Sequence, residues 1–242
     1  MRQASRGQEP GGVVLDYIAV VSGSYWSFNS GYTYRVTGNV WINRTTYLYG
    51  GAVIKYDRNA QLCVSGNFYC NSSAGNKAIL TSVDDTTVGE TILTGPPSGL
   101  YANDALNVYY VQTGTTFKGL HIRYAQDGLF FYSPFGLYYI NDSEFVACQH
   151  GVTCYYTTVY LNNLLMCDVE SPTYNQGQGY FYGTPTILVG SADNDGDGLS
   201  NRSELALFMT SPFAQDSDGD GIRDGVDLRA TDLFGSVSEA NE

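Results

Sequence analysis

Two segments in the middle of the chain repeat one another at a fixed offset. Residues 119–128 (GLHIRYAQDG) align with residues 142–151 (DSEFVACQHG), which begin 23 residues later, and residues 163–168 (NLLMCD) form a third copy. A period near 22 residues is typical of one turn of a parallel β-helix, in which short strands pair with the coils above and below. The repeat predicts two inward-facing stacks, one formed by Ile122, Phe145 and Leu165 and the other by Ala125 and Cys148.

Most of the chain has a composition and periodicity that suit this architecture. Short strand-like segments separated by Gly, Asn, Asp and Ser run from Val13 to residue 176, with almost no helical periodicity. The alternative fold is a β-sandwich or jelly roll, which would require hairpin turns between alternating strands. Asn-Gly and Asp-Gly turn signals are scarce before residue 190, so we predict a mainly β fold built on a parallel β-helix.

Two acidic runs near the C-terminus follow a second pattern. The first, Asp193–Glu204, has oxygen-bearing side chains at loop positions 1, 3, 5, 9 and 12 and glycine at position 6. This is the EF-hand-like pattern D-x-[DN]-x-[DN]-G-x5-E, whose position 7 supplies a backbone carbonyl. The second run, Asp216–Asp227, repeats it with aspartate at position 12. The predicted ligands are Asp193, Asp195, Asp197, Leu199, Asn201, Glu204, Asp216, Asp218, Asp220, Ile222, Asp224 and Asp227.

The spacing of these residues has a physical reason. Alternate residues of a tightly curled loop point inward, so three aspartates can surround one cation, and Gly198 and Gly221 permit the sharp turn. We expect the side chains of Leu199 and Ile222 to face a small apolar core. A solvated acidic run would not by itself produce two copies in register. The pattern therefore predicts at least two bound calcium ions (Ca2+).

The two loops together resemble the thrombospondin type 3 repeat. In that family, DxDxDGLx(D/N)xxE and DxDxDGIxDGxD units alternate with a short helix and a turn of a small residue and proline. Here residues 202–209 would form the helix, and Thr210-Ser211-Pro212 the turn. The resemblance covers about a fifth of the chain. It implies calcium bound for a structural purpose outside the cell.

A second resemblance concerns residues 34–85. The segments GGAVIK (50–55), AQLCVSG (60–66) and AILTSVDD (78–85) are similar to the opening coils of secreted right-handed parallel β-helix proteins. Such proteins often carry calcium repeats of the kind seen at the C-terminus. The resemblance implies a right-handed β-helix and says little about activity.

Charge is distributed unevenly along the chain. Residues 191–242 contain twelve acidic and three basic side chains, whereas residues 1–190 contain twelve and nine. We interpret the acidity as a local feature that binds cations. Nucleic acid is excluded as a partner because no basic patch could neutralise phosphates. No apolar run approaches the length of a membrane span.

These signals divide the chain into four parts. We expect an N-terminal arm at residues 1–12, a parallel β-helix at 13–176, a connector at 177–190 and the calcium module at 191–242. The arm lacks the hydrophobic segment of a signal peptide, so we expect a processed or reconstructed N-terminus. The open edges of a β-helix can pair with another chain unless they are covered. The arm and the calcium module could cover the two ends, or either end could dock head to tail on another copy.

Five cysteines leave at least one thiol unpaired. Cys63 and Cys70 could bridge neighbouring strands, whereas Cys148 and Cys167 lie among apolar residues and are expected to be buried free thiols. No pairing is assigned to Cys154. A zinc site is disfavoured because no C-x2-C spacing occurs and the two histidines lie far apart.

Aromatic residues and sequons indicate two further possibilities. Tyrosines could form ladders that stack against glycans, or they could pack against one another or a neighbouring subunit. The candidates are Tyr109, Tyr110, Tyr124, Tyr132, Tyr138, Tyr139, Tyr155, Tyr156 and Tyr160. Four N-x-[ST] sequons, at Asn43, Asn71, Asn141 and Asn201, would permit glycosylation. Asn201 also lies in the first calcium loop.

Signals for catalysis are weak. Glycoside hydrolysis requires two carboxyl groups that face one sugar, and the adjacent Asp84 and Asp85 would diverge in a strand. His150 resembles one element of the polygalacturonase family, but the other elements are missing. A polysaccharide lyase would need a basic residue near its cation, for which Lys118 and Arg123 are the candidates. Asp127 aligns with His150, so we expect no acidic ladder and no catalytic site there.

The sequence thus predicts a secreted or cell-surface structural or adhesive protein. Calcium would stabilise it, and it would self-associate head to tail as the repeating subunit of a filament or layer. The alternatives are a glycan-binding module and a polysaccharide lyase or hydrolase.

Overall fold

The computed structural model describes residues 17–227 and is mainly β-structure. The chain divides into two compact units, residues 1–186 and residues 187–242. The predicted N-terminal arm, residues 1–12, and the part of the calcium module after residue 227 lie outside the described residues.

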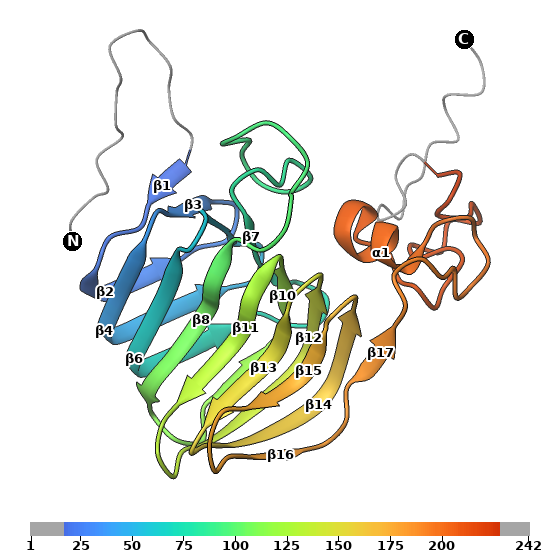
Figure 1. The fold of residues 1–242 in the computed structure, drawn as a ribbon. Helices are drawn as coiled ribbons and strands as arrows, with labels where there is room; N and C mark the ends of the chain where they lie inside the picture. The colour runs from blue at the N-terminus through green and yellow to red at the C-terminus, as the bar shows by residue number, and fades with distance from the viewer. Residues whose placement is uncertain (1–16, 228–242) are drawn as a thin grey trace, which may run out of the picture. The chain divides into compact units, whose positions relative to one another are not determined.

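Parallel strands wind the first unit into a β-solenoid of about eight turns, which confirms the predicted β-helix (Figure 1). Neighbouring strands are parallel along both sheets, so the antiparallel sandwich is excluded. One sheet runs through β1 (Tyr17–Ala19), β3 (Thr33–Val36), β5 (Val53–Tyr56), β7 (Ala78–Ser82), β10 (Leu120–Arg123), β12 (Leu137–Val146), β14 (Thr158–Cys167) and β16 (Tyr180–Tyr182), with β9 (Thr116–Lys118) also beside β12. The other runs through β2 (Gly23–Phe28), β4 (Asn39–Tyr49), β6 (Gln61–Asn71), β8 (Ala102–Val111), β11 (Ala125–Tyr132), β13 (His150–Tyr155) and β15 (Ser171–Asn175).

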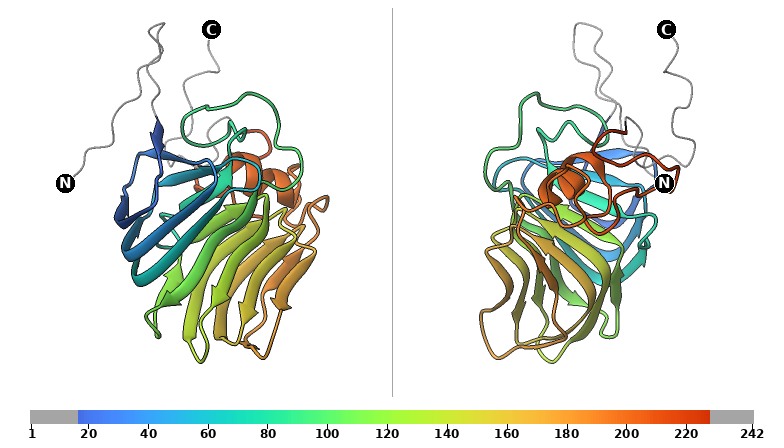
Figure 2. Two further views of the ribbon diagram at one scale, coloured as in Figure 1. Left: turned by 60° about the vertical axis from the view of Figure 1, so that its left-hand side comes forward. Right: turned by 90° about the vertical axis from the view of Figure 1, so that its right-hand side faces the viewer.

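The pairing continues into the range 177–190, which the sequence suggested as a connector. There β16 pairs with β14, so that Tyr182 lies beside Tyr160. The two further views in Figure 2 show the strands of successive coils lying side by side. The longest connection, residues 83–101 between β7 and β8, projects from the coils as the green loop of Figure 1.

Left-handed backbone conformations mark the coil corners. Residues 120–123 in β10, 143–146 in β12 and 164–167 in β14 each lie between two residues with φ between 49° and 58°. The residues at these corners are Gly119 and Tyr124, Asp142 and Ala147, and Asn163 and Asp168. At Gly119 a Cβ would also lie 2.4 Å from the backbone of Ser73, so glycine is required there for two reasons.

The core confirms one predicted stack and corrects the other. Ala125 and Cys148 are both buried in the main apolar cluster. In the other stack Ile122 pairs with Phe145, but Phe145 pairs with Met166, and Leu165 instead pairs with Glu144. The prediction of Leu165 as the third member was wrong by one residue, because Leu165 lies 20 residues after Phe145 whereas the structure pairs Phe145 with Met166, 21 residues later.

The second unit contains little regular structure. β17 (Thr186–Leu188) lies where the chain passes into this unit, and α1 (Asn201–Ser203) continues as a π-helical turn (Glu204–Phe208). The Ser200 hydroxyl caps the helix by accepting from Ser203 N, and Met209 ends it in a left-handed conformation. This matches the short helix expected at residues 202–209 to within one residue at each end.

Candidate metal-binding site

The two acidic loops fold with the same hydrogen-bond scheme. In the first loop the Asp193 carboxylate accepts from Gly196 N at 2.7 Å and from Gly198 N at 3.1 Å. The second loop repeats these contacts at 2.7 and 2.8 Å, with Asp216, Gly219 and Gly221. Such side-chain-to-backbone bonds curl a short segment without a helix or sheet.

The middle of each loop is held in the same way. Asp195 accepts from Asp197 N at 3.2 Å, and Asp197 accepts from Leu199 N at 2.7 Å. The matching contacts in the second loop, at 3.1 and 2.8 Å, involve Asp218, Asp220 and Ile222. The position-6 glycines have φ of 106° and 95°, a region that a Cβ disfavours. The repeated pattern therefore corresponds to a repeated backbone conformation.

These loops bring carboxylates together in three groups. In each group, one oxygen from each of three residues lies within 4.8 Å of the others. The first group contains loop positions 1, 3 and 5 of the first loop, and the second contains the same positions of the second loop. The third group combines Asp197 and Glu204 of the first loop with Asp224 of the second. The sequence pattern had assigned Asp224 to its own loop.

The third group is buried. Glu204 is 0% exposed, and neither of its carboxylate oxygens has a hydrogen-bond partner among the described residues. Burial and repulsion by Asp195, Asp197 and Asp224 raise the pKa of Glu204 to about 8. Two ionised carboxylates whose oxygens lie 4.8 Å apart repel each other by roughly 3 kcal/mol at an effective dielectric constant of 20. A hard divalent cation with oxygen ligands would offset that repulsion, so the donor set fits calcium.

Not every predicted ligand joins a carboxylate group. The Asn201 side chain is buried and braces the first loop, accepting from Asn194 N at 3.2 Å and donating to Val189 O at 2.8 Å. Asp227 is buried outside the three groups. Leu199 and Ile222 have half-buried side chains, and their proposed role is carried by the backbone carbonyls.

Asp224 has a second role in its own loop. Its carboxylate accepts from Ser217 N at 2.9 Å and from Ser217 Oγ at 2.6 Å. This is the position that Asn201 occupies in the first loop, where it accepts from Asn194 N. Asp224 therefore braces the second loop and also faces the carboxylates of the first.

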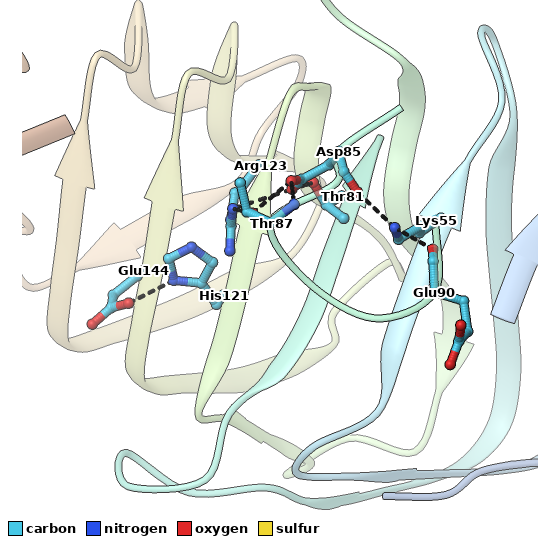
Figure 3. A network of polar contacts seen from close by, with 8 residues as sticks. All are labelled: Lys55, Thr81, Asp85, Thr87, Glu90, His121, Arg123 and Glu144. Carbon is cyan, nitrogen blue, oxygen red and sulfur yellow. Dashed lines mark hydrogen bonds and ion pairs between the residues drawn. The ribbon is translucent and has the colours of Figure 1, made fainter. Parts of the chain in front are cut away.

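A buried ionic network lies under the loop between β7 and β8 (Figure 3). Asp85 accepts from Arg123 at 3.1 Å and from the hydroxyls of Thr81 and Thr87, each at 2.6 Å. Burial alone would raise the pKa of Asp85, but Arg123 and these hydroxyls lower it below the usual value. Lys55 Nζ donates to two backbone carbonyls of the same loop, at 2.6 and 2.7 Å. Asp85, one of the two carboxyl groups considered for glycoside hydrolysis, therefore has a carboxylate that Arg123 and two threonines already engage.

Sequence reasoning missed an acidic row on the neighbouring face. Asp127 lies in register with Asp104 on one side and His150 on the other, and His150 Nδ1 is 3.0 Å from Asp127 Oδ1. Burial and the charge of Asp127 raise the pKa of Asp104 to about 6, although a hydrogen bond from Asn107 opposes the rise. The predicted alignment of Asp127 with His150 is confirmed, and Asp104 adds one acidic residue beside Asp127 that the sequence repeat did not include. Asp104 lies 23 residues before Asp127, in the coil that precedes the first copy of the repeat, so the repeat itself gives no sign of it.

The remaining catalytic candidates do not join this row. Asp84 contacts the Tyr101 hydroxyl, and Lys118 is exposed on β9.

All five cysteines are free thiols. Cys63 and Cys70 lie seven residues apart within the single strand β6, so they cannot bridge neighbouring strands as expected. Cys148 and Cys167 are buried, and burial raises the pKa of the Cys148 thiol to about 12. A thiol with so high a pKa is unreactive at neutral pH.

The tyrosines form three kinds of environment. Tyr109, Tyr132 and Tyr155, which we call the tyrosine ladder, stack with centroids 5.2 and 5.1 Å apart. A second stack joins Tyr139, Tyr160 and Tyr182 at 5.3 and 4.9 Å. Tyr110 and Tyr156 stand nearly perpendicular to the tyrosine ladder, and Tyr124 and Tyr138 are buried.

The sequons differ in accessibility. Asn43 and Asn71 are exposed and Asn141 is half-buried, whereas Asn201 is buried with its amide hydrogen-bonded. A glycan on Asn201 would have to displace those hydrogen bonds.

Comparison with protein-family models, curated proteins and solved structures finds no match for this chain. Within residues 17–227, no helix has the length and apolar character needed to cross a bilayer.

Proposed function

We propose that this chain is an extracellular structural or adhesive β-helix protein that calcium stabilises. The observation that carries the proposal is the buried group of Asp197, Glu204 and Asp224, which lies among other carboxylates. A buried charge that is not compensated costs several kcal/mol, so three carboxylates buried together need either a proton, as the raised pKa of Glu204 indicates, or a cation. The resemblance of the loops to thrombospondin type 3 repeats, based on their motif spacing, supports the same conclusion.

Calcium would act through residues of both loops. Asp193, Asp195 and Asp197 would hold one ion, and the matching residues of the second loop another. Because Asp224 approaches Asp197 and Glu204, an ion between these three would tie the loops to each other. Unfolded chains cannot present these oxygens together, so the binding energy would contribute to folding.

The resemblance of the loops to thrombospondin type 3 repeats and the exposed sequons favour an extracellular location. Extracellular calcium modules have dissociation constants of about 10⁻⁴–10⁻³ M and fill at the calcium concentrations found outside cells. The exposed sequons at Asn43 and Asn71 are accessible to modification on a secretory route.

Self-association would use the ends of the solenoid. Parallel coils leave edge strands whose backbone groups can pair with a second copy in the same direction. At the last coil, Tyr182 ends its aromatic stack and is exposed, and Tyr25 on the first-coil strand β2 is also exposed. Stacking of coils head to tail would extend both sheets into a filament.

The test compares the full chain with 5 mM calcium and with excess EDTA. In calorimetry, the unfolding transition of the second unit should move to lower temperature in EDTA. The far-UV circular dichroism signal, which comes mainly from the β-structure of the first unit, should be largely retained. Sedimentation should show that large particles dissociate. The triple change Asp193→Asn, Asp195→Asn and Asp197→Asn should reduce the calcium response, whereas Glu170→Gln, an exposed acidic residue of the first unit, should not. If melting temperature and particle size are the same in EDTA, the proposal is wrong.

Glycan binding is the second candidate, because two exposed tyrosines lie across the tyrosine ladder instead of within it. The rings inside the ladder are less suitable, since they cover one another's faces. We assign no catalytic role to Asp85, whose carboxylate is engaged by Arg123, Thr81 and Thr87.

A further inference from the structure

Three aromatic side chains are exposed at one corner of successive coils. Phe135 is 98% exposed, Tyr110 is 52% exposed and Tyr156 is 40% exposed. Tyr110 lies near the end of β8, Phe135 in the turn between β11 and β12, and Tyr156 just after β13. Phe135 N donates to Tyr156 O at 2.9 Å, which links the turn to the next coil. We call these three residues the aromatic platform.

The backbone at the aromatic platform has the left-handed conformation that also marks other coil corners. Tyr110, Phe135 and Tyr156 have φ of 52°, 63° and 54°, a left-handed conformation that bulky residues rarely adopt. Glycine or asparagine would fit such corners at lower cost, as at Gly119 and Asn163. Strained positions that carry large exposed side chains are a reason to look for function. Burial does not explain the rings, because all three are exposed.

The rings of the aromatic platform differ in orientation from the tyrosine ladder below. Ladder rings are nearly parallel, with interplanar angles of 12° and 7°, so that each covers the face of its neighbour. Tyr110 is turned by 79° from Tyr109, and Tyr156 by 87° from Tyr155. Among the described residues, no ring stacks face to face on Tyr110 or Tyr156. Tyr110 and Tyr156 pack edge to face against the tyrosine ladder and stay partly exposed, so together with Phe135 they keep aromatic surface that a ligand can cover.

The spacing of the rings selects a ligand class. Tyr109 and Tyr155 both pair with Tyr132, so Tyr110 and Tyr156 lie two coils apart. Two strand spacings amount to roughly 10 Å, with Phe135 on the intervening coil. That distance is close to the repeat of a disaccharide in an extended β-linked polysaccharide. Aromatic faces bind the apolar faces of such sugars, and a phenol hydroxyl adds a hydrogen bond.

We propose that the aromatic platform binds an uncharged, extended β-linked polysaccharide whose chain runs across successive coils. The platform residues carry no charge, and residues 1–190 contain twelve acidic and nine basic side chains, a small negative excess that disfavours polyuronates and other anionic glycans. This inference gives the adhesive part of the proposed function a ligand. It does not depend on calcium, because the three residues belong to the first unit.

Isothermal titration with cellohexaose and with chitohexaose tests the proposal, with hexagalacturonate as the anionic comparison. Binding of at least one neutral hexasaccharide is expected, in calcium and in EDTA alike. Phe135→Ala, Tyr110→Ala and Tyr156→Ala should each weaken it about 2- to 10-fold, the range of one aromatic stacking contact. Tyr160→Ala, from the other stack, is the matched control and should leave affinity unchanged.

Three results would overturn the inference. The first is the absence of binding to both neutral hexasaccharides, and the second is equal binding by the Tyr110→Ala/Tyr156→Ala variant. The third is a loss of self-association in the Phe135→Ala variant without any glycan binding by the parent, which would identify a protein interface. Because Phe135 has almost no buried surface, its variant should fold like the parent, which circular dichroism can check. Failure of the EDTA experiment would leave this result unaffected.

Discussion

Replacing Asp85 with alanine should destabilise the first unit far more than replacing Asp57, although each pairs with an arginine. The N–O distances are similar, 3.1 Å from Asp85 to Arg123 and 2.9 Å from Asp57 to Arg35. The Asp85 and Arg123 side chains are 1% and 0% exposed, whereas those of Asp57 and Arg35 are 26% and 23% exposed. The two pairs differ in burial and also in hydrogen bonding, because Arg35 donates two hydrogen bonds to Asp57, whereas Asp85 accepts one from Arg123 and others from Thr81 and Thr87.

The magnitudes follow from desolvation. Removing one partner of a buried pair costs about 3–5 kcal/mol because the other charge stays in a poorly solvated site. Removing one partner of an exposed pair costs about 0–1 kcal/mol. For a unit of this size, 1 kcal/mol shifts the melting temperature by about 2–4 °C. Asp85→Ala should thus lower it by about 6–20 °C, and Asp57→Ala by less than about 4 °C.

Urea and thermal unfolding in saturating calcium, followed by far-UV circular dichroism, measure both effects. Asp85→Ala should lose stability both because Arg123 is left as an unpaired charge and because Thr81 and Thr87 lose their acceptor. The double variant Asp85→Ala/Arg123→Met removes the first contribution and keeps the second. It should be more stable than Asp85→Ala alone, because the buried guanidinium is gone. Equal losses for Asp85→Ala and Asp57→Ala, or a double variant no more stable than the single one, would refute this reasoning.

Three further perturbations test other parts of the structure. Burial would raise the pKa of Glu144, but His121 and Lys77 lower it to about 2. Ionised Glu144 should therefore add about 3 kcal/mol to the free energy of unfolding above pH 4.5, and this contribution should disappear as the pH falls towards 2. In the Glu144→Gln variant, the free energy of unfolding should lack this part of its pH dependence. Glu204→Gln should stabilise the calcium-free second unit above about pH 8, where the buried carboxyl would ionise, and should reduce its response to calcium in calorimetry because a ligand is removed. Gly119→Ala should cost about 2 kcal/mol or more in urea unfolding, whereas Gly114→Ala, with positive φ but open space, should cost about 1 kcal/mol.

The strand register could be predicted from the sequence for those coils in which residues with left-handed conformation occur at the same offset. Residues 119–128 and 142–151 align because both coils turn at left-handed positions, Gly119 and Asp142, and span the same length. The third copy failed by one residue because Leu164-Leu165-Met166 is apolar throughout. Such a run has no alternation to show which side chains face inward, and a shift of one residue reverses the face. Met166 and not Leu165 therefore completes the stack.

The buried network could not be predicted for a different reason. Lys55 and Arg123 lie in strands, where a basic side chain is normally read as facing solvent. Both are buried because the loop at residues 83–101 returns across their face, and Lys55 donates to two of its carbonyls. A long loop without periodicity gives no signal of where it packs. The loop motifs of the second unit gave the local ligand spacing, but not the approach of Asp224 to the first loop.

The two units bury carboxylates under different conditions, and the difference bears on which unit should respond to calcium. In the first unit, Asp85 faces Arg123, and Glu144 lies 2.6 Å from His121 and 2.9 Å from Lys77. The folded chain supplies these partners itself, so this unit should keep its structure in EDTA. Glu204 is buried as deeply as Asp85, yet one of its carboxylate oxygens lies within 4.8 Å of carboxylate oxygens of Asp197 and Asp224. Without a cation this burial favours the protonated form of Glu204, as its pKa of about 8 indicates. We therefore expect the stability of the second unit to depend on calcium concentration.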